Sequence, residues 1–142
     1  MNTLFPKVRA SHLALAGLLA LSAGLAAASD AKVTLTGAQE TPAVATSATA
    51  SGTITVDADG AIRGSVTTKG IAGTAAHIHA GAPGQSGPPV IALAKTSDDV
   101  WSVPAGAKLT EDQIASYQAG KLYVNVHSAE NKKGEIRGQL TP

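Results

Sequence analysis

The chain has 142 residues, of which 44% are hydrophobic and 15% are charged, and it contains no cysteine. This length accommodates one domain, and the lack of cysteine excludes disulfide bonds and thiolate metal ligands. The formal net charge of +1 excludes the strongly basic character of proteins that bind nucleic acid by counterion release.

Residues 1–28 have the layout of a secretory signal peptide. Lys7 and Arg9 precede an uncharged apolar stretch, Leu13–Ala28, that ends in three alanines, and small residues before the cut are typical of signal cleavage. A membrane anchor is the alternative, but this stretch is shorter than the ~20 strongly apolar residues that span a bilayer. We therefore expect cleavage after Ala28 and a periplasmic or secreted protein that does not stay at the membrane.

Short segments rich in Val, Ile and Thr recur along the mature chain and predict β-strands. Between two of them, Asp57-Ala58-Asp59-Gly60 predicts a hairpin turn with a positive φ at Gly60. The predicted strands are 32–36, 49–56, 61–68, 75–80, 89–94, 100–103, 122–127 and 135–140. About eight short strands at this spacing predict an all-β fold, an antiparallel, Greek-key-like β-sandwich.

One segment, Leu109–Gly120, departs from the strand pattern and predicts a short helix. Thr110 and Gln113 have the spacing of a capping box, two acidic residues suit the positive end of the helix dipole, and the final glycine suits the helix end. We assign this helix to packing across one end of the sandwich. Residues 81–89 follow His79 directly and predict a loop, because they are dense in Gly and Pro.

Two of the three histidines in the mature chain, His77 and His79, lie in one predicted strand. Side chains alternate between the faces of a strand, so both imidazoles share one face about 7 Å apart, while their neighbours face the core. A lone histidine in a strand is more often a hydrogen-bonded structural residue than a ligand. Two imidazoles on one face, however, repel each other when protonated and compete for partners when neutral. A cation relieves both conflicts, so the pair favours a metal site.

The third histidine, His127, belongs to a later predicted strand. The aliphatic residues at 122, 124 and 126 form the core face of that strand, which leaves His127 on the opposite face with Tyr123 and Asn125. If the two strands are neighbours, three imidazoles converge on one point. We therefore predict that His77, His79 and His127 bind one metal ion.

The available ligands indicate which metal the site would hold. Met1 is lost with the leader, so no sulfur ligand for Cu(I) remains. Three imidazoles suit Cu(II) or Zn(II), and copper binds more tightly in the general affinity order, which makes copper the first choice and zinc the second. Glu135 or Glu130 could add a carboxylate ligand, although both also fit solvated charges at a turn and a strand edge. A serine nucleophile is disfavoured, because Ser128 beside His127 has no nucleophile elbow around it.

Several motifs resemble the CHRD domain, first described as a repeat in chordin and common as a stand-alone domain in exported bacterial proteins. They are Gly37–Pro42, Ala76–Gly84, Gly120–His127 and Gly134–Leu140. In this order they span nearly all of residues 32–140, and we place the domain at 29–142. The resemblance implies an extracellular role, which in chordin is antagonism of signalling proteins, but it implies no defined biochemistry. Tyr123, Asn125, Glu135 and Arg137 also belong to the pattern.

The strand His77-Ile78-His79 also resembles, locally, the copper-binding His-Val-His strand of copper-zinc superoxide dismutases. Their bridging histidine and zinc loop have no counterpart here, because the mature chain has no fourth histidine, and this argues against dismutase activity. Arg137 could lie near the metal and guide anions, with an ordinary strand-edge arginine as the alternative.

Three functions remain open on the sequence alone. The first is an exported copper-binding protein that buffers, stores or delivers the metal, with a periplasmic copper-handling protein as its candidate partner. The second is a metal-free extracellular interaction module in which Tyr123, Asn125 and the loop 81–89 form the contact surface. The third is a small dismutase-like redox enzyme. We rank these hypotheses in the order given, so a binding protein is favoured over an enzyme.

Overall fold

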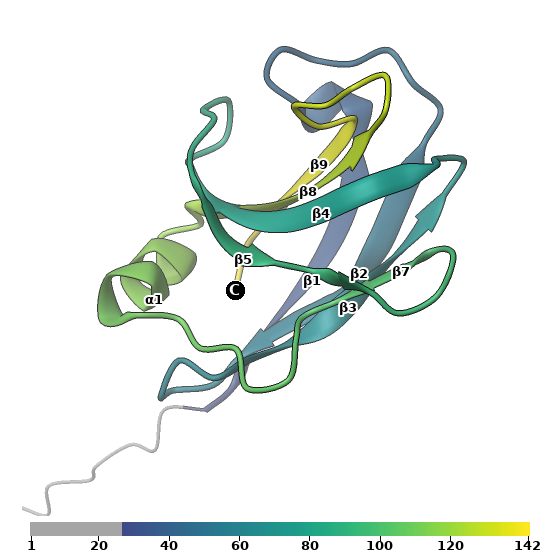
Figure 1. The fold of residues 1–142 in the computed structure, drawn as a ribbon. Coiled ribbons are helices and arrows are strands. Elements are labelled where there is room, and N and C mark those ends of the chain that lie inside the picture. The colour runs from purple at the N-terminus through teal and green to yellow at the C-terminus, as the bar shows by residue number, and fades with distance from the viewer. Residues whose placement is uncertain (1–26) are drawn as a thin grey trace, which may run out of the picture.

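The computed structural model describes residues 27–142, so nearly all of the predicted leader lies outside the described residues and its cleavage stays a prediction. The described chain forms nine strands, a single turn of 3-10 helix and one α-helix, α1 (Figure 1). The strands are β1 (Ser29–Thr36), β2 (Thr49–Val56), β3 (Ile62–Lys69), β4 (Gly73–Ala80), β5 (Pro89–Ala92), β6 (Ala94–Lys95), β7 (Val100–Ser102), β8 (Leu122–Ser128) and β9 (Ile136–Leu140). The predicted all-β class with one short helix is confirmed.

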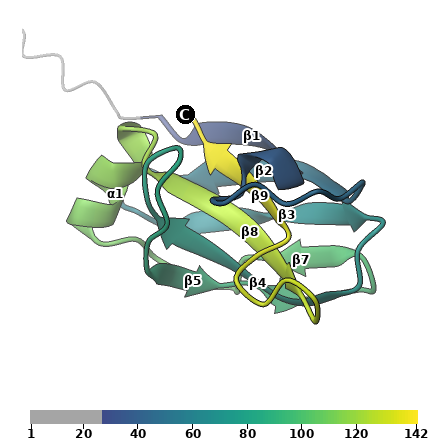
Figure 2. The ribbon, with the colours of Figure 1, turned by 90° about the horizontal axis from the view of Figure 1, so that it is seen from above.

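All strands belong to one antiparallel sheet with the order β5-β4-β8-β9-β1-β2-β3-β7-β6. The two edge strands, β5 and β6, are consecutive in the chain and are separated by Leu93 alone. The sheet therefore curls until its edges meet, with β4, β8 and β9 facing β2, β3 and β7 across the core (Figures 1 and 2). This arrangement is sandwich-like, and it divides the predicted strand 89–94 because its first half pairs with β4 and its second half with β7.

The interior is filled by aliphatic side chains that alternate with outward-facing residues along each strand. Leu35, Ile54, Ile78 and Val124 are fully buried there, as the period of two along a strand requires. Strand β8 is an exception, because loops cover its outer face and bury residues on both sides of the strand. This covered outer face of β8 carries the candidate site.

Helix α1 (Glu111–Gln118) covers one end of the curled sheet (Figure 2). The predicted capping box is confirmed, since Thr110 and Gln113 exchange side-chain to backbone hydrogen bonds. Tyr117 fixes the helix to the sheet, because its buried ring carries a hydroxyl that donates to the Ser29 carbonyl over 3.1 Å. Among residues 27–142, no helix is both long and apolar enough to cross a bilayer.

The predicted hairpin turn between β2 and β3 is also confirmed. Asp57 and Gly60 close it with a backbone hydrogen bond of 2.9 Å, and Gly60 has a φ of 87°. A side chain at this φ would be strained. One element was not predicted, the 3-10 turn η1 (Gly37–Gln39) directly after β1.

Candidate metal centre

Strands β4 and β8 are direct neighbours, which confirms the assumption on which the histidine prediction depended. In their register His77 lies opposite Asn125, His79 opposite Tyr123, and His127 opposite Ala75. Ile78, between His77 and His79, and Val126, beside His127, are fully buried in the core. The imidazoles therefore occupy the outer face, as the alternation predicted.

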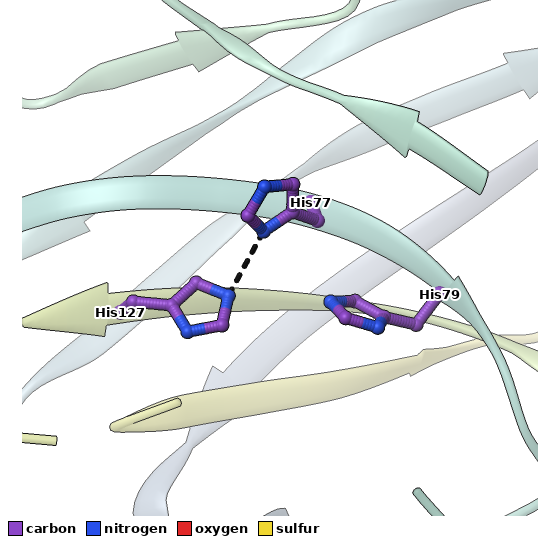
Figure 3. Close-up of side chains that lie close together, drawn as sticks. All are labelled: His77, His79 and His127. Atoms are coloured by element: carbon purple, nitrogen blue, oxygen red, sulfur yellow. Dashed lines mark hydrogen bonds between the residues drawn. The ribbon is translucent and has the colours of Figure 1, made fainter. Parts of the chain in front are cut away.

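The three imidazoles converge on one point above these two strands (Figure 3). Ring centroids are 4.9 Å apart for His77 and His127, 5.5 Å for His77 and His79, and 6.1 Å for His79 and His127. Each residue offers one ring nitrogen, and these nitrogens all lie within 4.8 Å of one another. One ion with bonds of about 2 Å separates two ligand nitrogens by at most about 4 Å, so a small inward movement of the side chains would let one ion bind all three rings.

Backbone carbonyls orient two of the rings. The Nδ1 of His79 is 2.8 Å from the Gly87 carbonyl oxygen, and the Nδ1 of His127 is 2.9 Å from the Lys132 carbonyl oxygen. Because a carbonyl only accepts, each Nδ1 carries the proton, and the neutral ring keeps a lone pair on Nε2. Histidines that bind metals are typically held by such a hydrogen bond from the other ring nitrogen.

The third ring completes the group through a contact between two imidazoles. The Nδ1 of His77 lies 2.9 Å from the Nε2 of His127 (Figure 3). Since His127 donates from its Nδ1, its neutral Nε2 accepts, so His77 provides the proton between them. For both nitrogens to bind a metal ion, the His77 proton would have to move from Nδ1 to Nε2, which keeps the ring neutral.

Burial favours the neutral form of His77 and His79, which metal binding requires. Desolvation lowers the pKa of His77, and the neighbouring rings of His127 and His79 lower it further. Desolvation also lowers the pKa of His79, an effect that the hydrogen bond to Gly87 opposes and the charges of His127 and Arg137 reinforce. Protons therefore compete less well for the lone pairs than they do for an exposed histidine.

Three buried side-chain atoms in the described chain have no hydrogen-bond partner: Glu40 Oε1, His79 Nε2 and Asn125 Oδ1. They belong to one neighbourhood, because Glu40 and Asn125 pack together against Gly134 and Asn125 lies opposite His77 on the face that carries His79. Unpaired buried polar atoms destabilise a fold. All three atoms have lone pairs, and a cation in this neighbourhood would favour each of them.

His79, Tyr123 and Arg137 form a stack of side chains on the outer face of the sheet. The Tyr123 ring lies parallel to the His79 ring at a centroid distance of 5.0 Å, and the Arg137 guanidinium lies 3.5 Å from the centroid of Tyr123. Arg137 is only 1% exposed and donates to the carbonyls of Ala82 and Gln85. Arg137 is therefore a buried residue that holds the loop 81–89, called the Gly-Pro loop below. Both sequence interpretations of Arg137, an anion guide and an ordinary strand-edge residue, are wrong.

The predicted carboxylate ligand, Glu135, is not brought into the histidine group. Its carboxylate accepts a hydrogen bond of 2.7 Å from the Thr46 hydroxyl, and its pKa is lowered by hydrogen bonds from Ser128 first and then from Thr46 and Asn131. Ser128 follows His127 in the strand and so points to the opposite face. The second candidate, Glu130, is exposed.

The carboxylate that does reach this neighbourhood is Glu40, which in the sequence is part of the motif Gly37–Pro42 only. It lies just after η1, and its Oε1 and the Asn125 Nδ2 lie beside Gly134. The structure also corrects the proposed interaction surface, because Tyr123 and Asn125 are only 3% and 2% exposed and cannot contact a partner.

Comparison with known proteins identifies the domain. The family model named CHRD domain matches residues 31–140. A search of the curated proteins found no match, and a search of the solved structures found none. The family match covers all strands except the first two residues of β1, and it includes the whole three-histidine group. The chain therefore belongs to the CHRD-domain family.

Proposed function

We propose that this CHRD-domain protein works outside the cytoplasm and binds one divalent transition metal ion, copper in preference to zinc, at His77, His79 and His127. The domain itself suggests an extracellular interaction module, and the proposal adds a metal to that role. One observation carries it: three ring nitrogens lie within 4.8 Å of one another. Carbonyl hydrogen bonds turn the Nε2 atoms of His79 and His127 toward the point of convergence.

The nature of the ligands favours copper. Three imidazoles without a sulfur ligand suit Cu(II) or Zn(II), and the general affinity order ranks copper above zinc.

The position of the site fits a metal that is loaded and released. His77, His79 and His127 are each only partly buried, and the hydrophobic core lies on the other face of the sheet. An ion bound here is therefore reachable from solvent, and the core does not depend on it. Buffering or delivery of copper, with a copper-handling protein as donor or acceptor, fits this arrangement better than a structural metal.

Metal titration of the purified mature protein tests the proposal. We expect one equivalent of Cu(II) to bind with a d–d absorption band, and free ion at 100 times the dissociation constant to stabilise the fold by about 2.7 kcal/mol. A His77→Ala/His79→Ala double variant should lose the band and the stabilisation. The control, Glu135→Gln, should retain both, because Glu135 lies outside the histidine group.

Absence of the band and of any rise in melting temperature in the parent protein would refute the proposal and leave a metal-free interaction module. Full binding by the double variant would refute the assignment of the ligands. A superoxide assay on the copper-loaded protein then distinguishes a binding protein, which gives background turnover, from a small redox enzyme.

A further inference from the structure

We infer that Asn125 supplies the fourth donor of this metal centre through its side-chain oxygen, and that Glu40 is the positioning residue that orients it. The inference rests on the proposed function, because it concerns the same three histidines. In place of the carboxylate ligand expected from the sequence, Glu135, the fourth donor is a neutral amide oxygen. The carboxylate of Glu40 contacts this amide and does not bind the metal itself.

Asn125 lies at the centre of the group in the register of the sheet. It is directly opposite His77, and on its own strand His127 is two residues away on the same face. His79 is the diagonal neighbour across the strand pair, within reach of side-chain contact. The Asn125 side chain therefore lies at the floor of the triangle that the three imidazoles form, and it is only 2% exposed.

The hydrogen bonds of the amide determine which of its atoms faces the histidines. Its Nδ2 donates to the Lys133 carbonyl over 3.3 Å, and both Nδ2 and Glu40 Oε1 lie beside Gly134. The carbonyl only accepts, so the NH2 group is turned toward Lys133 and Gly134. The opposite atom, Oδ1, is buried and has no partner.

The free oxygen belongs to a residue beside His79, because His79 is the diagonal neighbour of Asn125 across the strand pair. The Oδ1 of Asn125 and the Nε2 of His79 are both buried and have no hydrogen-bond partner. Neither atom carries a proton, so a cation shared between them would stabilise both. With His77 and His127 they provide three nitrogens and one oxygen, a set that suits Cu(II).

Glu40 is held tightly against the amide by the backbone. A Cβ atom on Gly134, which has a φ of 130°, would lie 2.4 Å from Glu40 Oε1 and 2.5 Å from Asn125 Nδ2. No side chain fits there, so the carboxylate and the amide are closely packed and cannot move apart toward residue 134.

Burial of this carboxylate costs stability in the absence of a cation. Desolvation raises the pKa of Glu40, against the lowering effects of Arg137, Asn125 and Thr41. A divalent ion bound above Asn125 would offset part of the charge of Glu40, whereas the three imidazoles and the amide are neutral. Groups that support the ligands from outside typically change metal affinity by roughly 10- to 100-fold when they are mutated.

Two substitutions at Asn125 separate an oxygen donor from a merely structural residue. Asn125→Leu removes the oxygen at similar volume, and Asn125→Asp retains an oxygen at the same position. Cu(II) affinity is measured by competition titration on folded protein, with the electron paramagnetic resonance spectrum as the second readout. We expect Asn125→Leu to bind roughly 10- to 100-fold more weakly with an altered spectrum, and Asn125→Asp to bind at least as tightly as the parent.

Glu40→Gln provides a test that does not depend on the folding of the Asn125 variants. It removes the charge but retains an acceptor for the amide. We expect a higher melting temperature without metal, because the buried charge is gone, together with a Cu(II) affinity that is about 10-fold lower. Glu135→Gln is the matched control, and it should leave Cu(II) affinity unchanged.

Equal Cu(II) affinities for the parent and Asn125→Leu would overturn the inference. Equal losses in Asn125→Leu and Asn125→Asp would overturn it too, because they would show that the NH2 group matters and the oxygen does not. Unchanged affinity in Glu40→Gln would remove its positioning role. Failure of the parent protein itself to bind Cu(II) would instead refute the proposed function, so the two failures are distinguishable.

Discussion

Arg137→Met is expected to be the most destabilising single change on the outer face of the sheet. The guanidinium makes three hydrogen bonds, to the carbonyls of Ala82 and Gln85 and to the side chain of Gln139. It also lies 3.5 Å from the centroid of the Tyr123 ring. Methionine fills a similar volume but donates nothing, so both loop carbonyls lose their charged donor.

The size of the effect can be estimated from these contacts. Hydrogen bonds to a charged group contribute about 1.5–3 kcal/mol each, but Arg137 is 1% exposed, and removing a buried charge returns part of its desolvation cost. We expect a net loss of about 3 kcal/mol in the free energy of unfolding. For a domain of this size that loss lowers the melting temperature by roughly 10 °C.

Guanidinium denaturation followed by the fluorescence of Trp101, the only tryptophan of the chain, measures this loss directly. The control is Arg63→Met, because Arg63 forms an exposed ion pair with Asp57 and such pairs contribute about 0–1 kcal/mol. A second readout is Cu(II) affinity, which should fall in Arg137→Met because the loop that orients His79 is released. A loss below about 1 kcal/mol, or equal losses in both variants, would show that Arg137 does not anchor the loop.

Two further changes test the packing and the protonation of the site. Gly134→Ala would place a Cβ 2.4 Å from the Glu40 carboxylate at a φ of 130°, whereas Gly84→Ala, at a φ of 76°, meets no atom within 4 Å. Urea unfolding should therefore show a loss larger by about 1–3 kcal/mol for Gly134→Ala, and equal losses would contradict the close packing. Acidification from pH 7.5 to 5.5 should destabilise the metal-free protein. The pKa values of His77 and His79 are lowered below 6.5, so the unfolded chain takes up protons first. The His77→Ala/His79→Ala variant should show a weaker dependence on pH, and an unchanged one would contradict this cause.

Local patterns made most of the strands predictable. Thr49–Val56 was predicted with the bounds that the structure has, because alternation and the turn at Gly60 act between residues that are close in the chain. The capping box at Thr110 is equally local. The division of segment 89–94 was not predictable in this way, because it depends on which strands pair with β5 and β6 at the two edges of the sheet.

In the candidate site, too, features set by local patterns were predictable and features set by long-range contacts were not. The face shared by His77 and His79 followed from the period of two within one strand, and the nature of the ligands followed from the composition. Glu135 was proposed as a ligand because it follows His127 closely in the chain, but the Thr46 hydroxyl holds its carboxylate elsewhere. Glu40 is distant in sequence from every histidine, and no local pattern connected it to them.

The sequence by itself determined an all-β chain with three imidazoles on outward-facing strand positions, because side-chain direction in a strand depends only on position. The tertiary structure decided that β4 and β8 are neighbours, that the Gly-Pro loop covers Tyr123, and that Glu40 reaches Asn125. These contacts join residues far apart in the chain. They arise only when the curled sheet buries its apolar face and brings distant loops over one strand.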